Sequence, residues 1–156
     1  MLKEKQLNND LTTTKSGFVG SIDESRALME QIASQNSIPI SVVKDTIKVG
    51  GLFNSQELGC LVVSNPEHER DYYKIVIVPS VGETTVATTG VSKQMKKFAI
   101  AEAAKAQRKG KSLSYKIGHA ATSSLWLLGK SKNKLEAEQA YYDAVIELIA
   151  VAYEFQ

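Results

Sequence analysis

The sequence predicts an α+β fold, in which an antiparallel sheet of three or four strands is packed on one face by helices, with a long helix at the C-terminus. Three short segments rich in Val, Ile, Tyr and Thr predict the strands, over residues 58–64, 71–78 and 83–89. The segments before and after them show helical periodicity instead. With 156 residues, 43% hydrophobic and 23% charged, the chain is the size of one folded domain. We expect that domain over residues 21–156, after a flexible arm over residues 1–20, where periodicity is weak.

The helices are indicated by start signals and apolar faces. Ser21 and Glu24 have the spacing of a capping box, so a first helix is predicted from there to about residue 35. Residues 40–53 are compatible with a short helix or with a strand, and the helical alternative would give a helix-turn-helix of the kind that binds DNA. Three helices are predicted after the strands, over residues 92–109, 112–128 and 133–155.

The last predicted helix is apolar on nearly all sides between residues 144 and 152. Such a helix is either buried deeply in its own domain or packed against another subunit. The second alternative makes it an interaction helix and suggests a homo-oligomer or another protein partner. Its contacts would be made by Val145, Leu148, Ile149 and Ala152.

Charge is strongly sorted along the chain, although the net charge is only +2. Residues 91–134 carry 11 basic side chains and one acidic one, whereas residues 135–156 carry five acidic side chains and no basic one. The basic block could bind nucleic acid, or the acidic helix could compensate it. The basic side chains that would contact phosphates are Lys93, Lys96, Lys97, Arg108 and Lys109.

No motif for catalysis, a metal or a cofactor stands out. Gly129-Lys130-Ser131 looks like the end of a phosphate-binding loop, but it follows a predicted helix and better fits a helix stop. Cys60 has no cysteine partner and is expected to be a small buried side chain. His68 has acidic neighbours on both sides in a polar turn, without a second histidine at ligand spacing.

The order of helix, three strands and helix resembles the double-stranded-RNA-binding domain over residues 21–109. That family has a proline and histidine in the loop between its first two strands, and Asn65-Pro66-Glu67-His68 is similar to it. It also has a basic motif at the start of its last helix, where this chain has Ser92-Lys93, with Gln94 in place of a lysine. The resemblance implies that duplex RNA is contacted by His68, Lys93, Lys96 and Lys97.

Location and function are predicted only broadly. The first residues are polar and no apolar signal segment follows, no stretch is suited to crossing a membrane, and a single cysteine is typical of the cytoplasm. We therefore expect a soluble, cytoplasmic, non-enzymatic domain that acts through protein contacts. The alternatives are nucleic-acid binding through residues 91–116 and binding of a small apolar ligand between the sheet and the helices.

Overall fold

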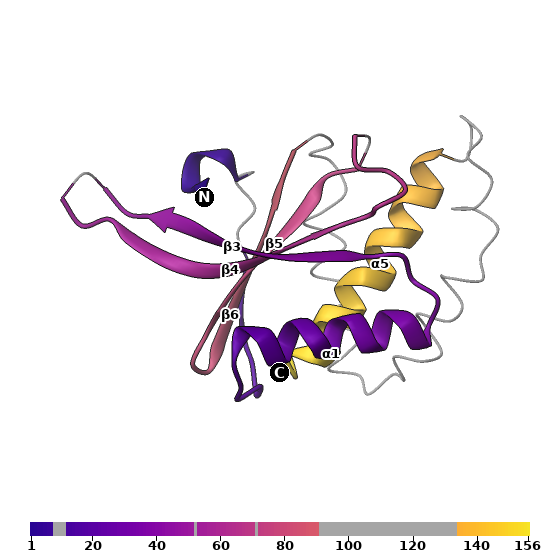
Figure 1. The fold of residues 1–156 in the computed structure, drawn as a ribbon, viewed down its shortest axis with the longest axis horizontal. Helices are drawn as coiled ribbons and strands as arrows, with labels where there is room; N and C mark the ends of the chain where they lie inside the picture. The colour runs from indigo at the N-terminus through magenta and orange to yellow at the C-terminus, as the bar shows by residue number, and fades with distance from the viewer. Residues whose placement is uncertain (8–11, 52, 71, 91–133) are drawn as a thin grey trace.

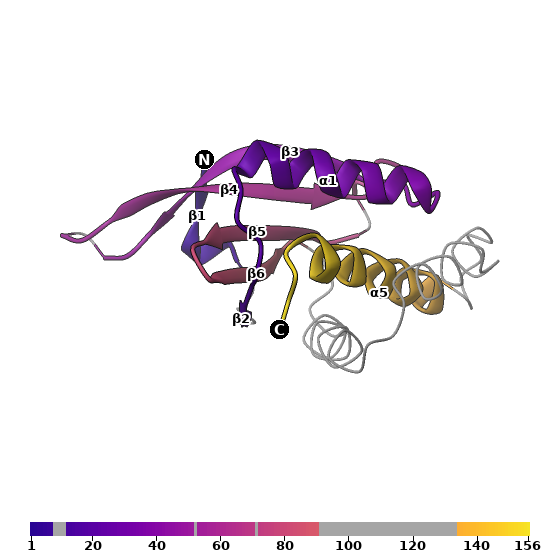
Figure 2. The same ribbon diagram turned by 90° about the horizontal axis from the view of Figure 1, so that it is seen from below.

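The computed structural model describes residues 1–7, 12–51, 53–70, 72–90 and 134–156. Its centre is a six-stranded sheet with the strand order β1-β3-β4-β5-β6-β2 (Figures 1 and 2). The helices are α1 (Ile22–Gln35), α5 (Lys134–Ala152) and the short 3-10 helix η1 (Glu4–Gln6). The strands are β1 (Leu2–Lys3), β2 (Thr12–Lys15), β3 (Ser41–Val49), β4 (Gln56–Ser64), β5 (Lys74–Ser80) and β6 (Glu83–Thr89).

The predicted α+β class is confirmed, while the predicted sheet is corrected. Strands β3 to β6 form an antiparallel meander, and three of them match the predicted segments closely. The sheet is nevertheless mixed, because β1 runs parallel to β3, and it has six strands instead of three or four. The predicted helices over residues 92–109 and 112–128 lie outside the described residues.

Residues 1–20, expected from the sequence to be a flexible arm, contain two strands where the structure describes them. β1 pairs with β3, and β2 pairs antiparallel with β6, so this segment supplies both edge strands. The strands beside them determine this pairing. With two and four residues, β1 and β2 are too short to show the alternation of apolar and polar side chains that predicts a strand from sequence. Residues 41–49 are a strand, which excludes the helix-turn-helix alternative.

The first helix begins where the capping box predicts. The Glu24 amide donates to the Ser21 hydroxyl (3.1 Å), and the Ser21 amide donates to the Glu24 carboxylate (2.8 Å). These two bonds satisfy amides that have no partner within the first helical turn. The helix ends at Gln35, and Ser37 follows with a positive φ of 55°.

The main core lies between one face of the sheet and the two helices, which pack on that face together (Figure 2). The four predicted interaction residues Val145, Leu148, Ile149 and Ala152 are all fully buried in this core. They therefore present no apolar face to a partner. Of the two alternatives drawn from the apolar helix, deep burial within the chain is the one observed.

A second, smaller apolar cluster lies on the other face of the sheet. It contains the buried side chains of Leu7, Ile47, Cys60, Val76 and Ala87. The Cys60 thiol is fully buried, as the sequence predicts. Burial and, as a smaller cause, the nearby Asp45 carboxylate together raise its pKa to about 11.

The hairpin of β3 and β4 extends well beyond the two helices (Figures 1 and 2). Its strands pair without interruption from Ser41 opposite Ser64 to Val49 opposite Gln56. The turn leaves β3 through Gly50, which has a φ of +96° and thus a conformation that other residues rarely adopt. The hairpin tip and the first residues of the chain lie at the same end of the molecule.

Candidate functional site

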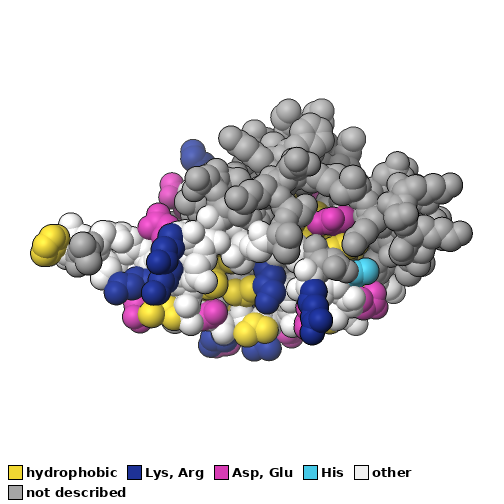
Figure 3. Space-filling model, turned by 90° about the horizontal axis from the view of Figure 1, so that it is seen from above, with side chains coloured by type: hydrophobic (Ala, Val, Ile, Leu, Met, Phe, Trp, Pro, Cys, Tyr) yellow, Lys and Arg dark blue, Asp and Glu magenta, His cyan; other side chains and the backbone are white. Residues whose placement is uncertain are grey.

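A concave pocket lies between the β3–β4 hairpin and the start of the chain. Its volume is about 810 Å³, which is within the range of ligand sites. Three lysines, from β1, η1 and β3, line this pocket, and we call it the lysine pocket. Its lining residues are Lys3, Glu4, Lys5, Lys48, Gly50, Gly51 and Ser55. Figure 3 shows basic side chains gathered beside the hairpin and a hydrophobic side chain at its tip.

The parallel pairing of β1 with β3 brings two of the lysines together. Lys3 is the register partner of Lys48, so the two side chains share one face of the sheet. Like charges at neighbouring positions on paired strands are destabilising. On the β4 side of β3, Lys48 lies opposite Glu57, whose carboxylate places one negative charge beside the two lysines. A bound anion would relieve the repulsion between Lys3 and Lys48.

The three pocket lysines have no ion-pair partner within 4.0 Å among the residues that the structure describes. Elsewhere such pairs do form, as between Lys44 and Asp23 at 2.9 Å. Lys3, Lys5 and Lys48 are all exposed. Their ammonium groups are therefore available to a ligand that enters the pocket.

Glu4 is the acidic residue of the pocket, and it has a structural contact. Its carboxylate accepts a hydrogen bond of 3.2 Å from the backbone amide of Gly50. This bond ties η1 to the hairpin turn. Three lysines and one glutamate give the lining a formal charge of 3 − 1 = +2. A pocket of that charge and size can hold one or more phosphate groups.

The two glycines of the pocket differ in what they require. A Cβ on Gly50 would collide with the backbone carbonyl of Asn54, whereas a Cβ on Gly51 would meet nothing within 4 Å. Gly50 therefore shapes the turn, and Gly51 leaves its backbone open to an incoming ligand. Ser55 adds a hydroxyl group that can donate to a phosphate oxygen.

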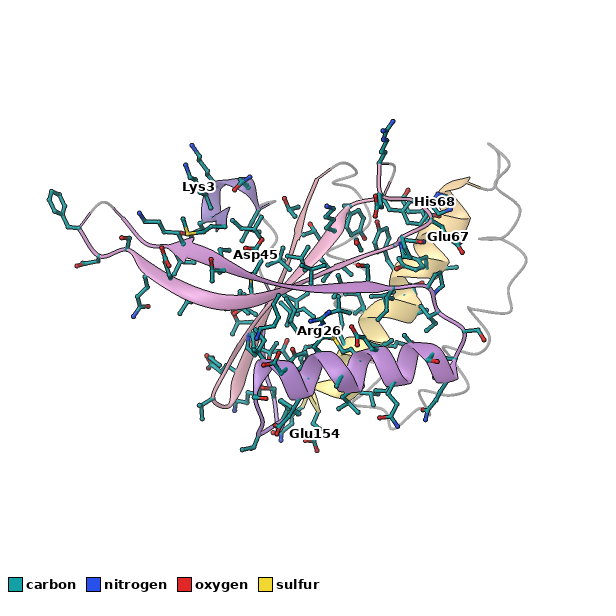
Figure 4. The ribbon with its side chains drawn as sticks, viewed as in Figure 1. Lys3, Arg26, Asp45, Glu67, His68 and Glu154 are labelled. Atoms are coloured by element: carbon teal, nitrogen blue, oxygen red, sulfur yellow. The ribbon has the colours of Figure 1, made fainter. Side chains whose placement is uncertain are left out.

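His68, predicted as a nucleic-acid contact, lies at the opposite end of the molecule from Lys3 (Figure 4). It is half-buried, and its ring stacks on Tyr72 with centroids 4.4 Å apart and planes 9° apart. The other predicted contacts, Lys93, Lys96, Lys97, Arg108 and Lys109, lie outside the described residues. The resemblance to the double-stranded-RNA-binding domain therefore stays a prediction.

The surroundings of His68 are a cluster of tyrosines that joins the β4–β5 connection to α5. Tyr73 stacks on Tyr142 with centroids 3.6 Å apart, and the Tyr142 hydroxyl donates to the Tyr73 carbonyl at 2.7 Å. The Tyr141 hydroxyl donates to the Pro39 carbonyl at 2.8 Å. Burial raises the pKa of both Tyr141 and Tyr142 above the ordinary value. This arrangement fixes the start of α5 on the sheet.

A second, smaller hollow of about 370 Å³ lies near the start of α1. It is lined by Phe18, Val19, Gly20, Ile22, Gly59, Pro79, Ser80 and Val81. Ser80 is the one polar side chain of this lining, and its hydroxyl donates to the Glu83 carbonyl, so the hollow is mainly apolar. Within the described ranges no three His, Cys, Asp or Glu residues come together as metal ligands. No helix in the same ranges is long and apolar enough to cross a membrane.

Comparisons with protein-family models, with curated proteins and with solved structures found no match to this chain.

The lysine pocket was not predicted from the sequence. Lys3 and Lys5 fall in the segment expected to be a flexible arm, and Lys48 falls in the segment left open between helix and strand. If residues 44–48 are a strand, Lys44, Thr46 and Lys48 share one face, because side chains two residues apart point to the same side of a sheet. This pattern was the available signal for a basic face.

Proposed function

We propose that this protein binds nucleic acid by holding backbone phosphates in the lysine pocket. The observation that carries the proposal is that Lys3 and Lys5, from the first residues of the chain, meet Lys48 of β3 at one concave site, without an ion-pair partner among the described residues. Lysines that contact phosphates release counterions, which makes binding favourable at low salt.

The other predicted functions have less support. Self-association rested on the apolar C-terminal helix, and the four side chains expected to contact a partner are part of this chain's core. The apolar-ligand hypothesis requires a pocket between sheet and helices. The main core occupies that space except for the hollow of about 370 Å³ beside the start of α1, which is at the lower end of the size range of ligand sites. The nucleic-acid alternative keeps its support and gains a second basic site besides residues 91–116.

The test measures binding of a labelled oligonucleotide at low salt, with fluorescence anisotropy as the readout. We expect the parent protein to bind, and the variant Lys3→Gln/Lys5→Gln/Lys48→Gln to bind much more weakly. All three lysines are exposed, so glutamine is expected to leave the fold intact.

A matched control removes the same amount of charge elsewhere. Lys15, Arg70 and Lys74 are exposed and lie outside the pocket, so Lys15→Gln/Arg70→Gln/Lys74→Gln is expected to bind nearly as well as the parent. An equal loss in both triple variants would mean that net charge, and not the pocket, determines binding. No binding by the parent at low salt would end the proposal.

A further inference from the structure

The tip of the β3–β4 hairpin carries an aromatic side chain in full contact with solvent. Phe53 is 97% exposed. The other aromatic residues in the described part of the chain are buried or half-buried. Some of their rings pack against one another, as Phe18 and Tyr153 do with ring centroids 5.5 Å apart. Phe53 makes no such packing contact with the described residues and is almost wholly exposed, so stability does not explain a large apolar ring at this position.

Phe53 belongs to the same turn that forms one wall of the lysine pocket. Gly50 and Gly51 precede it and Ser55 follows it, and all three line the pocket. An aromatic ring and a set of phosphate-binding groups are therefore held together by one short turn. Along the chain, Phe53 is two residues from Gly51 and two residues from Ser55, both of which line the pocket.

We propose that Phe53 stacks on an unpaired base of a single-stranded nucleic acid whose backbone lies in the lysine pocket. This inference rests on the proposed function and names its substrate class. Stacking requires an open base face, which single strands offer along their length and duplexes offer only at their ends. Because every base has such a face, binding is expected to show little sequence preference.

An anionic membrane is the other kind of surface that an exposed aromatic side chain beside lysines can bind. The hairpin fits it less well, because the residues next to Phe53 are Asn54, Ser55 and Gln56, and Glu57 adds an exposed negative charge. A membrane surface is also broad, whereas the lysines line a concave pocket that a strand can enter.

The experiment measures binding to an oligothymidylate, to a blunt duplex and to phosphatidylserine vesicles. We expect the parent to prefer the single strand, and Phe53→Ala to bind it about 10- to 100-fold more weakly, the range for loss of one base stack. The dependence on salt is expected to stay unchanged, since no charge is removed. Phe53→Trp should bind like the parent, and its added tryptophan fluorescence should be quenched by the oligonucleotide.

Val81→Ala is the matched control, because Val81 is fully exposed at the tip of the β5–β6 hairpin and should not affect binding. Unchanged affinity of Phe53→Ala, with weak binding by the triple lysine variant, would overturn the stacking inference and leave the proposed function standing. Absence of any nucleic-acid binding by the parent would overturn both. Vesicle binding that depends on Phe53, without oligonucleotide binding, would assign the tip to membranes.

Discussion

Cys60 illustrates how the environment of a single residue decides its chemistry. Its thiol is fully buried, and burial together with the Asp45 carboxylate raises its pKa to about 11. The thiolate is the reactive form, so the folded protein is expected to resist alkylation by iodoacetamide at pH 8. Labelling, followed by mass spectrometry, should become fast only in denaturant. Fast labelling of the folded protein would contradict the buried placement.

The raised pKa of Cys60 also has a consequence for stability. A folded pKa above the unfolded one means that the folded state holds its proton more tightly, so the stabilisation is complete below pH 9 and is lost as the pH rises towards about 11. The urea midpoint of the parent should therefore fall relative to that of Cys60→Ala over this range. The comparison removes the effect of the buried tyrosines, which are present in both proteins.

Glu4 is the residue that limits the charge of the lysine pocket. Glu4→Gln keeps an oxygen that can accept from the Gly50 amide and raises the formal charge of the lining from +2 to +3. Affinity for an oligonucleotide at low salt should rise about 2- to 5-fold, since an exposed charge is worth up to about 1 kcal/mol. Glu154→Gln, on the exposed C-terminal turn, should leave affinity unchanged. Weaker binding by Glu4→Gln would mean that the carboxylate itself contacts the ligand.

Among the elements, the hairpin turn offers a matched pair of glycines. Gly50 has a φ of +96° and no room for a Cβ, whereas Gly51 has open space around it. Gly50→Ala should lower the free energy of unfolding by about 1–3 kcal/mol, the usual cost of a strained backbone position. Gly51→Ala should have little effect. Urea unfolding measures both, and equal losses would show that the turn is not as described.

The elements that the sequence predicts well are those whose signals are local. The capping box at Ser21 and Glu24 marks the start of α1 correctly, and β-branched runs mark β4, β5 and β6. β1 and β2 were missed because short edge strands depend on the strands beside them. The pairing of Lys3 with Lys48 joins segments far apart in the sequence, so the alternation of Lys44, Thr46 and Lys48 could indicate a shared face but not the pocket.

At the scale of the whole molecule, α5 is a core helix and not a docking surface. Leu148 is fully buried, so Leu148→Asp is expected to unfold the protein, with a loss well above the 2–5 kcal/mol typical of a buried leucine truncated to alanine. Val151, half-buried on the same helix, should tolerate Asp better. Circular dichroism during urea unfolding measures both. A folded Leu148→Asp protein that only changes its sedimentation would restore the interaction-helix hypothesis.

His68 and Lys3, which belong to two different candidate nucleic-acid surfaces, lie far apart. His68 lies beside the start of α5, and Lys3 lies at the other end beside the hairpin (Figure 4). Substitution of His68 is therefore expected to leave nucleic-acid binding at the lysine pocket unchanged. A duplex RNA contact of the kind implied by the family resemblance would use a different surface from the one proposed here.

The most direct test of the central claim is the dependence of oligonucleotide affinity on salt. Each phosphate neutralised on a single strand contributes about 0.7 to the slope of log affinity against log salt, so loss of three lysine contacts should reduce the slope by about 2. We predict that reduction for Lys3→Gln/Lys5→Gln/Lys48→Gln and an unchanged slope for Lys15→Gln/Arg70→Gln/Lys74→Gln. Equal slopes for the parent and both variants would contradict the claim that the lysine pocket holds the phosphates.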